Sequence, residues 1–387
     1  MVLVVRKDIR AAVEHLDPPL AVLDLDAARD NARAMSMRAA GTPIRVASKS
    51  LRIRALISDV LSLPGFQGIL AYSLPEALWL HATGTADDIL VAYPTTHRAG
   101  LAELCSNPAA REAITLMVDS PEHVDLIAAY ATAPVRVCID VDASLKYGPV
   151  HIGARRSPIH SADAVVELAT TITRHPAVQL VGLMAYEGQI AGTTDSSPAI
   201  VAMKRLSAAE LARRRARIVA AVQDACGPLE FVNGGGTGSI ETTTAEEAIT
   251  EIGAGSGILG SGLFDRYTTF QSTPAQWFVV PVTRKPTPHM VTVSGGGRVA
   301  SGPINPDRLP TVDWPAGLTM TALEGPGEVQ TPLAGPAARN LQLGDHVWMR
   351  HAKAGEANEF TADVVVVSGG EILATWPTYR GEGKAFV

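Results

Sequence analysis

The chain has 387 residues, of which 47% are hydrophobic and 19% are charged, and its formal net charge is −6. A chain of this composition can bury a large core, which excludes a disordered or collagen-like protein. The acidic balance gives no long-range attraction for phosphate backbones, so nucleic acid is not an expected partner. At roughly 150 residues per domain, the length predicts two or three domains, or one α/β barrel of about 250 residues with a smaller domain.

Cysteine usage and hydropathy indicate the compartment. Cys105, Cys138 and Cys226 are odd in number and widely spaced, which indicates neither a disulfide framework nor a cysteine zinc site. The apolar run at the N-terminus is too short for a signal peptide, and no stretch reaches the roughly 18 apolar residues that a bilayer span needs. We therefore expect a cytoplasmic protein without a membrane partner.

Short β-branched runs alternate with Ala/Leu-rich helical segments between about residues 43 and 255. The eight strand candidates are Ile44–Ala47, Gly68–Ala71, Ile89–Ala92, Ile114–Val118, Val135–Val141, Leu180–Ala185, Glu230–Val232 and Ala248–Ile252. Such alternation predicts parallel βαβ units, and eight of them are the number that closes a (β/α)8 barrel of the TIM type. The pattern leaves a doubly wound sheet open as the alternative.

The pattern changes after the barrel candidate. A Gly/Thr/Ser-rich insert over residues 189–200 and a long amphipathic helix over residues 201–226 follow the sixth strand candidate. Beyond residue 265, strands are expected at Trp277–Val282, Met290–Val293, Leu318–Leu323, His346–Met349 and Asp363–Val367. These strands predict a separate, smaller all-β domain. We expect the barrel over residues 20–265 and the β-domain over residues 266–387 together with 1–19, which the strand-like segment Ala21–Leu25 could join.

Lys49 ends the first strand candidate of the barrel, between small residues. Active sites of (β/α)8 barrels gather at the C-terminal ends of the strands. A partly desolvated lysine there can lose its proton near neutral pH and form a Schiff base with a carbonyl compound. The alternative is a solvated lysine at a strand end, which position alone favours.

A glycine-rich segment, Gly234–Ser239, follows the seventh strand candidate, where barrels commonly hold a phosphate on backbone N–H groups and hydroxyls. The residues expected to bind this phosphate are Gly235, Gly236, Thr237, Gly238 and Ser239. A flexible turn is the alternative. A dinucleotide fingerprint is excluded, because the third glycine of GxGxxG would fall on Ser239.

Polar residues at other strand ends are further candidates. Tyr186 follows the sixth strand candidate, and Arg156, which can bind a phenolate or carboxylate or simply lie on the surface, follows the fifth. In the β-domain, strand alternation predicts that His351 and Lys353 share a face, with Glu356 nearby. A protonated lysine offers no lone pair to a metal, so a closed zinc site is not expected.

Together these features resemble the fold-type III pyridoxal-phosphate enzymes, the alanine racemase-like barrels, and within them the D-threonine aldolase and D-serine dehydratase branch. The resemblance covers nearly the whole chain: residues 47–50 are similar to the cofactor-lysine segment and Gly234–Ser239 to the phosphate loop. The other similar segments are Gly153–Ser157 with Arg156, Gly182–Gly188 with Tyr186, Gly344–His351, Trp376 and Arg380–Gly381. The resemblance implies pyridoxal 5'-phosphate (PLP) on Lys49, a small amino-acid substrate and a homodimer.

Two positions depart from the family's pattern. The family's metal site pairs a histidine with a cysteine or aspartate two residues later, whereas Lys353 stands two residues after His351. A divalent metal is therefore doubtful, and His351 is a metal ligand only if one binds. We hypothesise that the Lys353 ammonium takes the metal's place and polarises the substrate hydroxyl or carboxylate. Gln189 stands where the branch has a histidine, and an amide cannot serve as a general base.

The resemblance implies a lyase that acts on D-configured β-hydroxy amino acids. The expected reaction is retro-aldol cleavage to glycine and an aldehyde, with Lys49, His351 and Lys353 as the catalytic residues. Dehydration to a keto acid and ammonia is the first alternative. A racemase, for which Tyr379 is the candidate second base, and a non-catalytic PLP-binding protein follow. Without the resemblance, the phosphate loop alone predicts a barrel enzyme acting on a phosphorylated metabolite.

Overall fold

The computed structural model describes residues 5–386. They form two compact units, each described here by itself. We call the first, residues 33–49 and 57–255 with Phe386, the barrel unit. We call the second the strand-rich unit; it consists of residues 5–32, Ser50–Leu56 and Ser256–Ala385.

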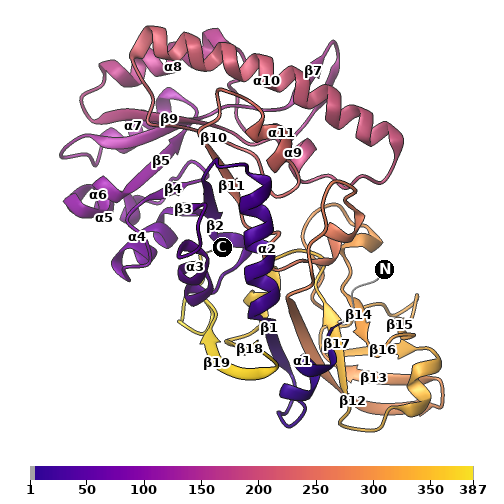
Figure 1. The fold of residues 1–387 in the computed structure, drawn as a ribbon. Helices are drawn as coiled ribbons and strands as arrows, with labels where there is room; N and C mark the ends of the chain where they lie inside the picture. The colour runs from indigo at the N-terminus through magenta and orange to yellow at the C-terminus, as the bar shows by residue number, and fades with distance from the viewer. Residues whose placement is uncertain (1–4, 387) are drawn as a thin grey trace. The chain divides into compact units, whose positions relative to one another are not determined.

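Eight parallel strands of the barrel unit close in the order β10-β11-β2-β3-β4-β5-β6-β9 (Figure 1). In chain order they are β2 (Ile44–Ala47), β3 (Phe66–Ala71), β4 (Ile89–Val91), β5 (Ile114–Val118), β6 (Val135–Asp140), β9 (Val178–Ala185), β10 (Phe231–Gly234) and β11 (Glu251–Ala254). Strands covered on both faces read as continuous apolar runs, and all five residues of β5 are buried. The predicted (β/α)8 barrel is confirmed, and the doubly wound alternative is excluded.

Several helices of the first 250 residues begin at a side-chain cap. The helices of this part of the chain are α1 (Lys7–Ala12), α2 (Leu25–Arg38), α3 (Arg54–Leu61), α4 (Leu74–Ala82), α5 (Arg98–Ser106), α6 (Pro108–Ala113), α7 (Pro121–Ala128), α8 (Ala162–Arg174), α9 (Gly188–Ala191), α10 (Pro198–Cys226) and α11 (Ile240–Thr244). Ser197 caps the 29-residue α10 by accepting a hydrogen bond from the Ile200 N–H. The insert over residues 189–200 is therefore partly helical, since α9 and the first turn of α10 lie within it.

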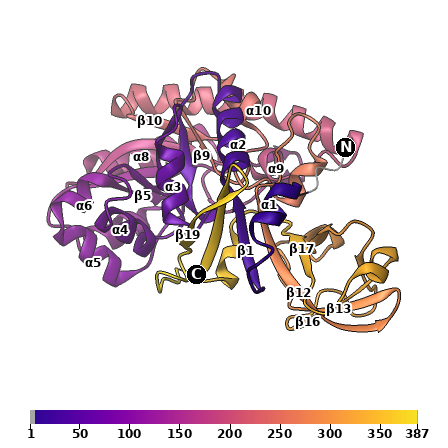
Figure 2. The same cartoon turned by 60° about the horizontal axis from the view of Figure 1, so that its bottom comes forward.

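The strand-rich unit contains one sheet of nine strands. Its strands are β1 (Leu20–Asp24), β12 (Gln276–Thr287), β13 (Met290–Ser294), β14 (Thr311–Trp314), β15 (Thr319–Met320), β16 (Gln330–Ala334), β17 (His346–Arg350), β18 (Asp363–Ser368) and β19 (Glu371–Pro377). The main path runs β15-β16-β13-β12-β1-β18-β19, with β17 between β12 and β14. β1 pairs antiparallel with β12 and parallel with β18, so the N-terminal segment supplies an interior strand (Figure 2). The predicted strand-rich part after the barrel is confirmed.

A short hairpin and several 3-10 turns lie between the larger elements. β7 (Leu145–Tyr147) and β8 (Val150–Ile152) form a hairpin after β6. The 3-10 turns are η1 (Ser48–Ser50), η2 (Gly262–Arg266), η3 (Pro306–Arg308), η4 (Pro336–Asn340) and η5 (Glu356–Phe360).

Several predicted strands differ in extent from the observed ones, and two of the differences have a clear physical reason. The segment predicted at 318–323 keeps only the two residues of β15, because Leu323 is fully exposed and packs against no core. β11 begins at Glu251, three residues later than predicted. A buried ion pair explains this glutamate, since Arg45 donates to both of its carboxylate oxygens at 2.8 and 2.9 Å.

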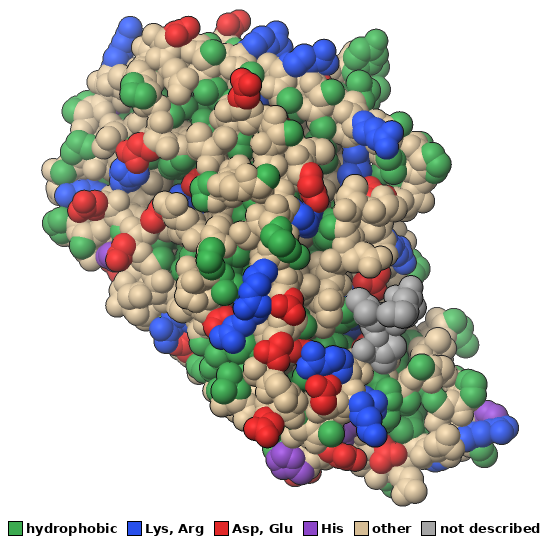
Figure 3. Space-filling view, viewed as in Figure 1, with side chains coloured by type: hydrophobic (Ala, Val, Ile, Leu, Met, Phe, Trp, Pro, Cys, Tyr) green, Lys and Arg blue, Asp and Glu red, His purple; other side chains and the backbone are tan. Residues whose placement is uncertain are grey.

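The surface carries charges of both signs. Lys/Arg and Asp/Glu side chains are interspersed on the face drawn in Figure 3. Within residues 5–386, every helix is too short or too polar to cross a lipid bilayer.

Candidate active site

The structure places Lys49 in η1, directly after β2 at the C-terminal end of the barrel. Its neighbours Ser48 and Ser50 are buried, whereas the Lys49 side chain is exposed. The Ser48 hydroxyl donates to the Leu70 carbonyl on β3 at 3.2 Å. This contact anchors the turn on the N-terminal side of the lysine.

Tyr93 is a site residue that the sequence analysis missed. It follows β4, and its hydroxyl oxygen accepts a hydrogen bond from Lys49 Nζ at 2.9 Å. Arg156 donates to the same oxygen, and its guanidinium lies 5.8 Å from the centre of the Tyr93 ring. Burial acts to raise the pKa of Tyr93, but Lys49 and Arg156 outweigh it and hold this pKa below its ordinary value. The only signal in the sequence was an aromatic residue at a strand end.

Two carboxylates at neighbouring strand ends were also missed. Asp119 follows β5 and Asp140 ends β6. Burial and the charge of Asp119 raise the pKa of Asp140 to about 7, against the opposing effect of Arg156. Arg156 therefore acts on both the Tyr93 phenol and the Asp140 carboxyl, and the pKa of each group is shifted from its ordinary value.

The predicted phosphate loop follows β10. A Cβ added at Gly236 would lie 2.8 Å from the Ala191 Cβ and 3.3 Å from the Tyr186 ring, so only glycine lets the backbone approach this ring. The Gly235 N–H donates to Glu187 at 3.1 Å, and the Ser239 hydroxyl donates to the same carboxylate at 2.9 Å. The Gly235 N–H and the Ser239 hydroxyl are therefore used inside the protein.

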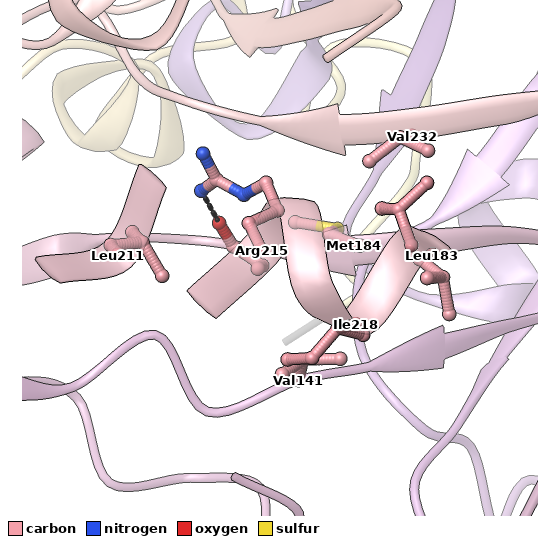
Figure 4. A pocket seen from close by; sticks show the side chains of 9 residues that line it. Val141, Leu183, Met184, Leu211, Arg215, Ile218 and Val232 are labelled. Carbon is pink, nitrogen blue, oxygen red and sulfur yellow. Dashed lines mark hydrogen bonds between the residues drawn. The ribbon is translucent and has the colours of Figure 1, made fainter. Parts of the chain in front are cut away.

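Glu187 ties this loop to two helices. Its carboxylate, which is 1% exposed, also accepts from the Thr243 hydroxyl on α11 and from Arg215 Nη2 on α10 at 3.2 Å. Arg215 in turn donates to the Ala185 carbonyl at 2.9 Å, the bond drawn in Figure 4. The small cavity in Figure 4 is lined mostly by apolar side chains of β9, β10 and α10, so it lies between these strands and α10.

Tyr186 and Gln189 have different roles in the barrel unit. Burial raises the pKa of Tyr186, so its hydroxyl keeps its proton and can donate to an anion. Gln189 Nε2 donates to the Ala143 carbonyl at 2.7 Å and to the Ser207 hydroxyl at 2.9 Å. The amide therefore anchors α9 to α10 and to the segment that follows β6.

His351 and Lys353 lie in the strand-rich unit. They follow β17, which ends at Arg350, so the prediction that strand alternation places them on one face was wrong. Instead, the chain turns and the Lys353 N–H donates to His351 Nδ1 at 3.1 Å. Lys353 Nζ donates to the Ser301 hydroxyl at 3.0 Å and lies 3.7 Å from the Glu356 carboxylate.

The surroundings of His351 do not fit a divalent metal. His351 is 6% exposed, and within the described residues its Nε2 has no hydrogen-bond partner. Burial lowers the pKa of His351, and the cations Arg298 and Lys353 lower it further. The neighbouring Glu356 carboxylate is already bound by the N–H and hydroxyl of Ser301. Two cations would repel a metal ion here, and within residues 5–386 no cluster of three metal-ligating side chains exists.

Comparison with known proteins identifies the family. Residues 23–261 match the family model described as alanine racemase, N-terminal domain. D-threonine aldolase of an Arthrobacter species is 27% identical over 323 residues, which cover 80% of this chain and 78% of that protein. 3-hydroxy-D-aspartate aldolase of Paracoccus denitrificans is 28% identical over 258 residues, covering 62% of this chain and 60% of that protein.

Solved structures share the fold. D-threonine aldolase from Filomicrobium marinum has a TM-score of 0.80 at 22% identity, covering 95% of this chain and 96% of that one. D-threo-3-hydroxyaspartate dehydratase from Delftia sp. HT23 has a TM-score of 0.74 at 21% identity, covering 95% and 98%. The closed parallel barrel with a lysine at the end of a strand and a glycine-rich loop is that of the alanine racemase-like proteins. The chain belongs to the alanine racemase N-terminal domain family.

The barrel unit fits PLP. Lys49 has an amine that could react with the cofactor aldehyde, and the glycine-rich loop after β10 could offer backbone N–H groups to its phosphate. Gly236 leaves room for an anion beside the Tyr186 ring, and the Tyr186 hydroxyl is a further donor. The hydrogen bonds from Gly235 and Ser239 to Glu187 fix both ends of this loop.

Proposed function

We propose that this protein is a PLP-dependent lyase that cleaves D-configured β-hydroxy amino acids into glycine and an aldehyde. The observation that supports it best is the hydrogen bond from the Lys49 amine to Tyr93, which Arg156 also contacts, at the strand ends of a barrel whose curated relatives are named aldolases. When bound, the cofactor supplies an electron sink for the bond that breaks at the substrate Cα.

The residues of the barrel unit bind and orient. In this proposal Lys49 would hold the cofactor covalently, and residues 236–238 with the Tyr186 hydroxyl would bind its phosphate. Arg156 offers a second cation beside Tyr93. Gly235 and Ser239 contribute to the binding site indirectly, because the Gly235 N–H and the Ser239 hydroxyl donate hydrogen bonds to the Glu187 carboxylate. Neutral Tyr186 lets the anion bind without charge repulsion.

From the resemblance we carry over one further part of the proposal. His351 accepts the proton of the substrate β-hydroxyl, and the Lys353 ammonium polarises that hydroxyl or the carboxylate. Burial keeps His351 neutral at physiological pH, which a base requires, since burial lowers its pKa. Because the donor set around His351 does not suit a divalent cation, we expect activity without a metal. The family resemblance also leads us to propose a homodimer, which sedimentation velocity tests.

The proposal is tested by product analysis on D-threonine, L-threonine, D-serine and D-alanine, each with manganese and with a chelator. We expect glycine and acetaldehyde from D-threonine alone, at the same rate after prolonged chelation. Lys49→Ala should lose the yellow colour and the activity, whereas Lys7→Ala, on the exposed face of α1, should keep both. Keto acid as the sole product would contradict the aldolase and favour the dehydratase. Enantiomer exchange would favour a racemase, and loss of activity on chelation with recovery on adding metal would refute the role of Lys353.

A further inference from the structure

The proposed function assigns Tyr93 no chemical step, although its hydroxyl is in direct contact with the cofactor lysine. Lys49 Nζ and the Tyr93 hydroxyl oxygen are 2.9 Å apart, and the two residues lie at the ends of β2 and β4, on either side of β3. Arg156 donates to the same oxygen. An oxygen that accepts from two cationic donors is well suited to carry a negative charge itself, because charge-assisted hydrogen bonds to an anion are the stronger ones.

The other charged groups around this oxygen support such a state. Tyr186, from the end of β9, stays neutral because burial raises its pKa. Asp140, whose pKa is raised to about 7, lies toward Arg156. The groups that act on Tyr93 itself are therefore cations: burial opposes ionisation, but Lys49 and Arg156 together lower the pKa of this phenol.

We propose that Tyr93 is a further catalytic residue, which exchanges a proton with Nζ of Lys49. A protonated amine has no lone pair, so Lys49 must lose a proton before its nitrogen can bond to the cofactor aldehyde carbon. The Tyr93 phenolate takes that proton: an O–H bond forms, an N–H bond breaks, and the electron pair of the broken bond stays on nitrogen. The pair passes from ammonium and phenolate to amine and phenol, with no net change in charge. The reverse transfer reprotonates the amine when Lys49 is released.

This inference rests on one part of the proposed function, the assignment of Lys49 as the lysine that binds the cofactor. It does not depend on which bond of the substrate breaks. It can therefore be tested on cofactor attachment, a step that needs no substrate.

The test follows PLP attachment to the full-length protein freed of cofactor, as a function of pH. Absorbance gives the rate, and borohydride reduction followed by mass spectrometry gives the yield on Lys49. For Tyr93→Phe we expect attachment at pH 7 at least tenfold slower, a midpoint at least one pH unit higher, and rates that converge with wild type at high pH. Tyr130→Phe is the matched control, because Tyr130 follows α7 and lies toward the opposite end of the barrel.

Ultraviolet difference titration gives a second readout that needs no cofactor. Wild type should show one tyrosine that ionises below the others, Tyr93→Phe should lack it, and Lys49→Met should move it to higher pH. Arg156→Gln, which removes one of the two cations, should shift the attachment midpoint in the same direction as Tyr93→Phe and by less. This variant keeps the inference testable if Tyr93→Phe folds poorly.

The outcomes separate the two proposals. An attachment profile of Tyr93→Phe with an unchanged midpoint, even at a uniformly lower rate, would overturn the proton exchange and leave a packing role for Tyr93. A wild-type protein that attaches no PLP would overturn the proposed function instead. Both proposals would be contradicted if Tyr93→Phe attached PLP with the pH dependence of wild type and the wild-type protein had no lyase activity.

Discussion

At the scale of the residue, the buried position of Asp140 disfavours its ionised form and so costs stability at neutral pH. Burial and Asp119 raise the pKa of its carboxyl from 3.8 to about 7. Well below pH 3.8 the carboxyl is neutral in both the folded and the unfolded chain, so its ionisation costs no stability there. As the pH rises from 4 to 7, the unfolded chain ionises and the folded chain does not, so the free energy of unfolding falls, by at most about 4 kcal/mol. A cost of this size at the strand ends indicates a residue kept for function.

We predict that Asp140→Asn stabilises the protein freed of cofactor at pH 8, by about 1–4 kcal/mol, and has little effect at pH 4, because the amide never ionises. Urea unfolding at pH values from 4 to 8 measures both numbers. Asp125→Asn, an exposed position on α7, is the control and should change stability by less than about 0.5 kcal/mol. An unchanged pH dependence in Asp140→Asn would show that Asp140 ionises normally.

At the scale of the element, the carboxylate of Glu187 joins β9 to the loop after β10, to α10 and to α11. Its oxygens accept from Gly235 N, Ser239 Oγ and Thr243 Oγ1, and Arg215 balances its charge. A buried anion beneath a phosphate loop repels the phosphate unless a cation neutralises it. Arg215 performs this neutralisation, and it also pairs with Glu246 at 2.5 Å.

Replacing Glu187 tests whether this network shapes the loop. Glu187→Gln places amide hydrogens against the donors of Gly235 and Arg215, so we expect the affinity for PLP to fall about ten- to hundredfold, or about 1.4–2.8 kcal/mol. Fluorescence titration of the protein freed of cofactor measures the dissociation constant. Glu230→Gln, which removes an exposed ion pair with Arg136 at the other end of β10, should leave it within about twofold. Equal affinity in Glu187→Gln and wild type would contradict the role of the network.

These elements also show what the sequence could predict. The barrel strands were recognised because burial on both faces makes each one a short apolar run bounded by polar residues. β14, β16 and β19 were missed, because their exposed positions and prolines break any such run. Lys49 and the glycine loop were found as polar or glycine-rich ends of strands. Tyr93 and Asp140 were not, since a phenol and a carboxyl next to apolar residues look like ordinary strand residues until their neighbours are known.

At the scale of the whole molecule, the strand-rich unit depends on a segment from the other end of the chain. β1 lies between β12 and β18, and α1 packs on the same sheet. Ile9 and Val22 share one buried cluster with Trp277 and Trp348, whose rings are 6.0 Å apart. Without residues 5–32, β12 and β18 would each lose their common neighbour, and both tryptophans would be exposed to water.

A fragment of residues 256–387 should therefore not fold by itself. Its unpaired strand edges would promote aggregation, and the loss of β1 would open the cluster around Trp277 and Trp348. Joining residues 1–32 to its C-terminus through a flexible linker restores β1 and should recover a cooperative unfolding transition. Tryptophan emission measures this directly: red-shifted for the short fragment, blue-shifted for the joined one. The emission of the same fragment joined to a scrambled copy of residues 1–32 should remain red-shifted. A scrambled segment has the same composition but cannot pair in register with β12 and β18, so the sheet does not form. A short fragment with blue-shifted emission and a sharp transition would show that β1 is dispensable.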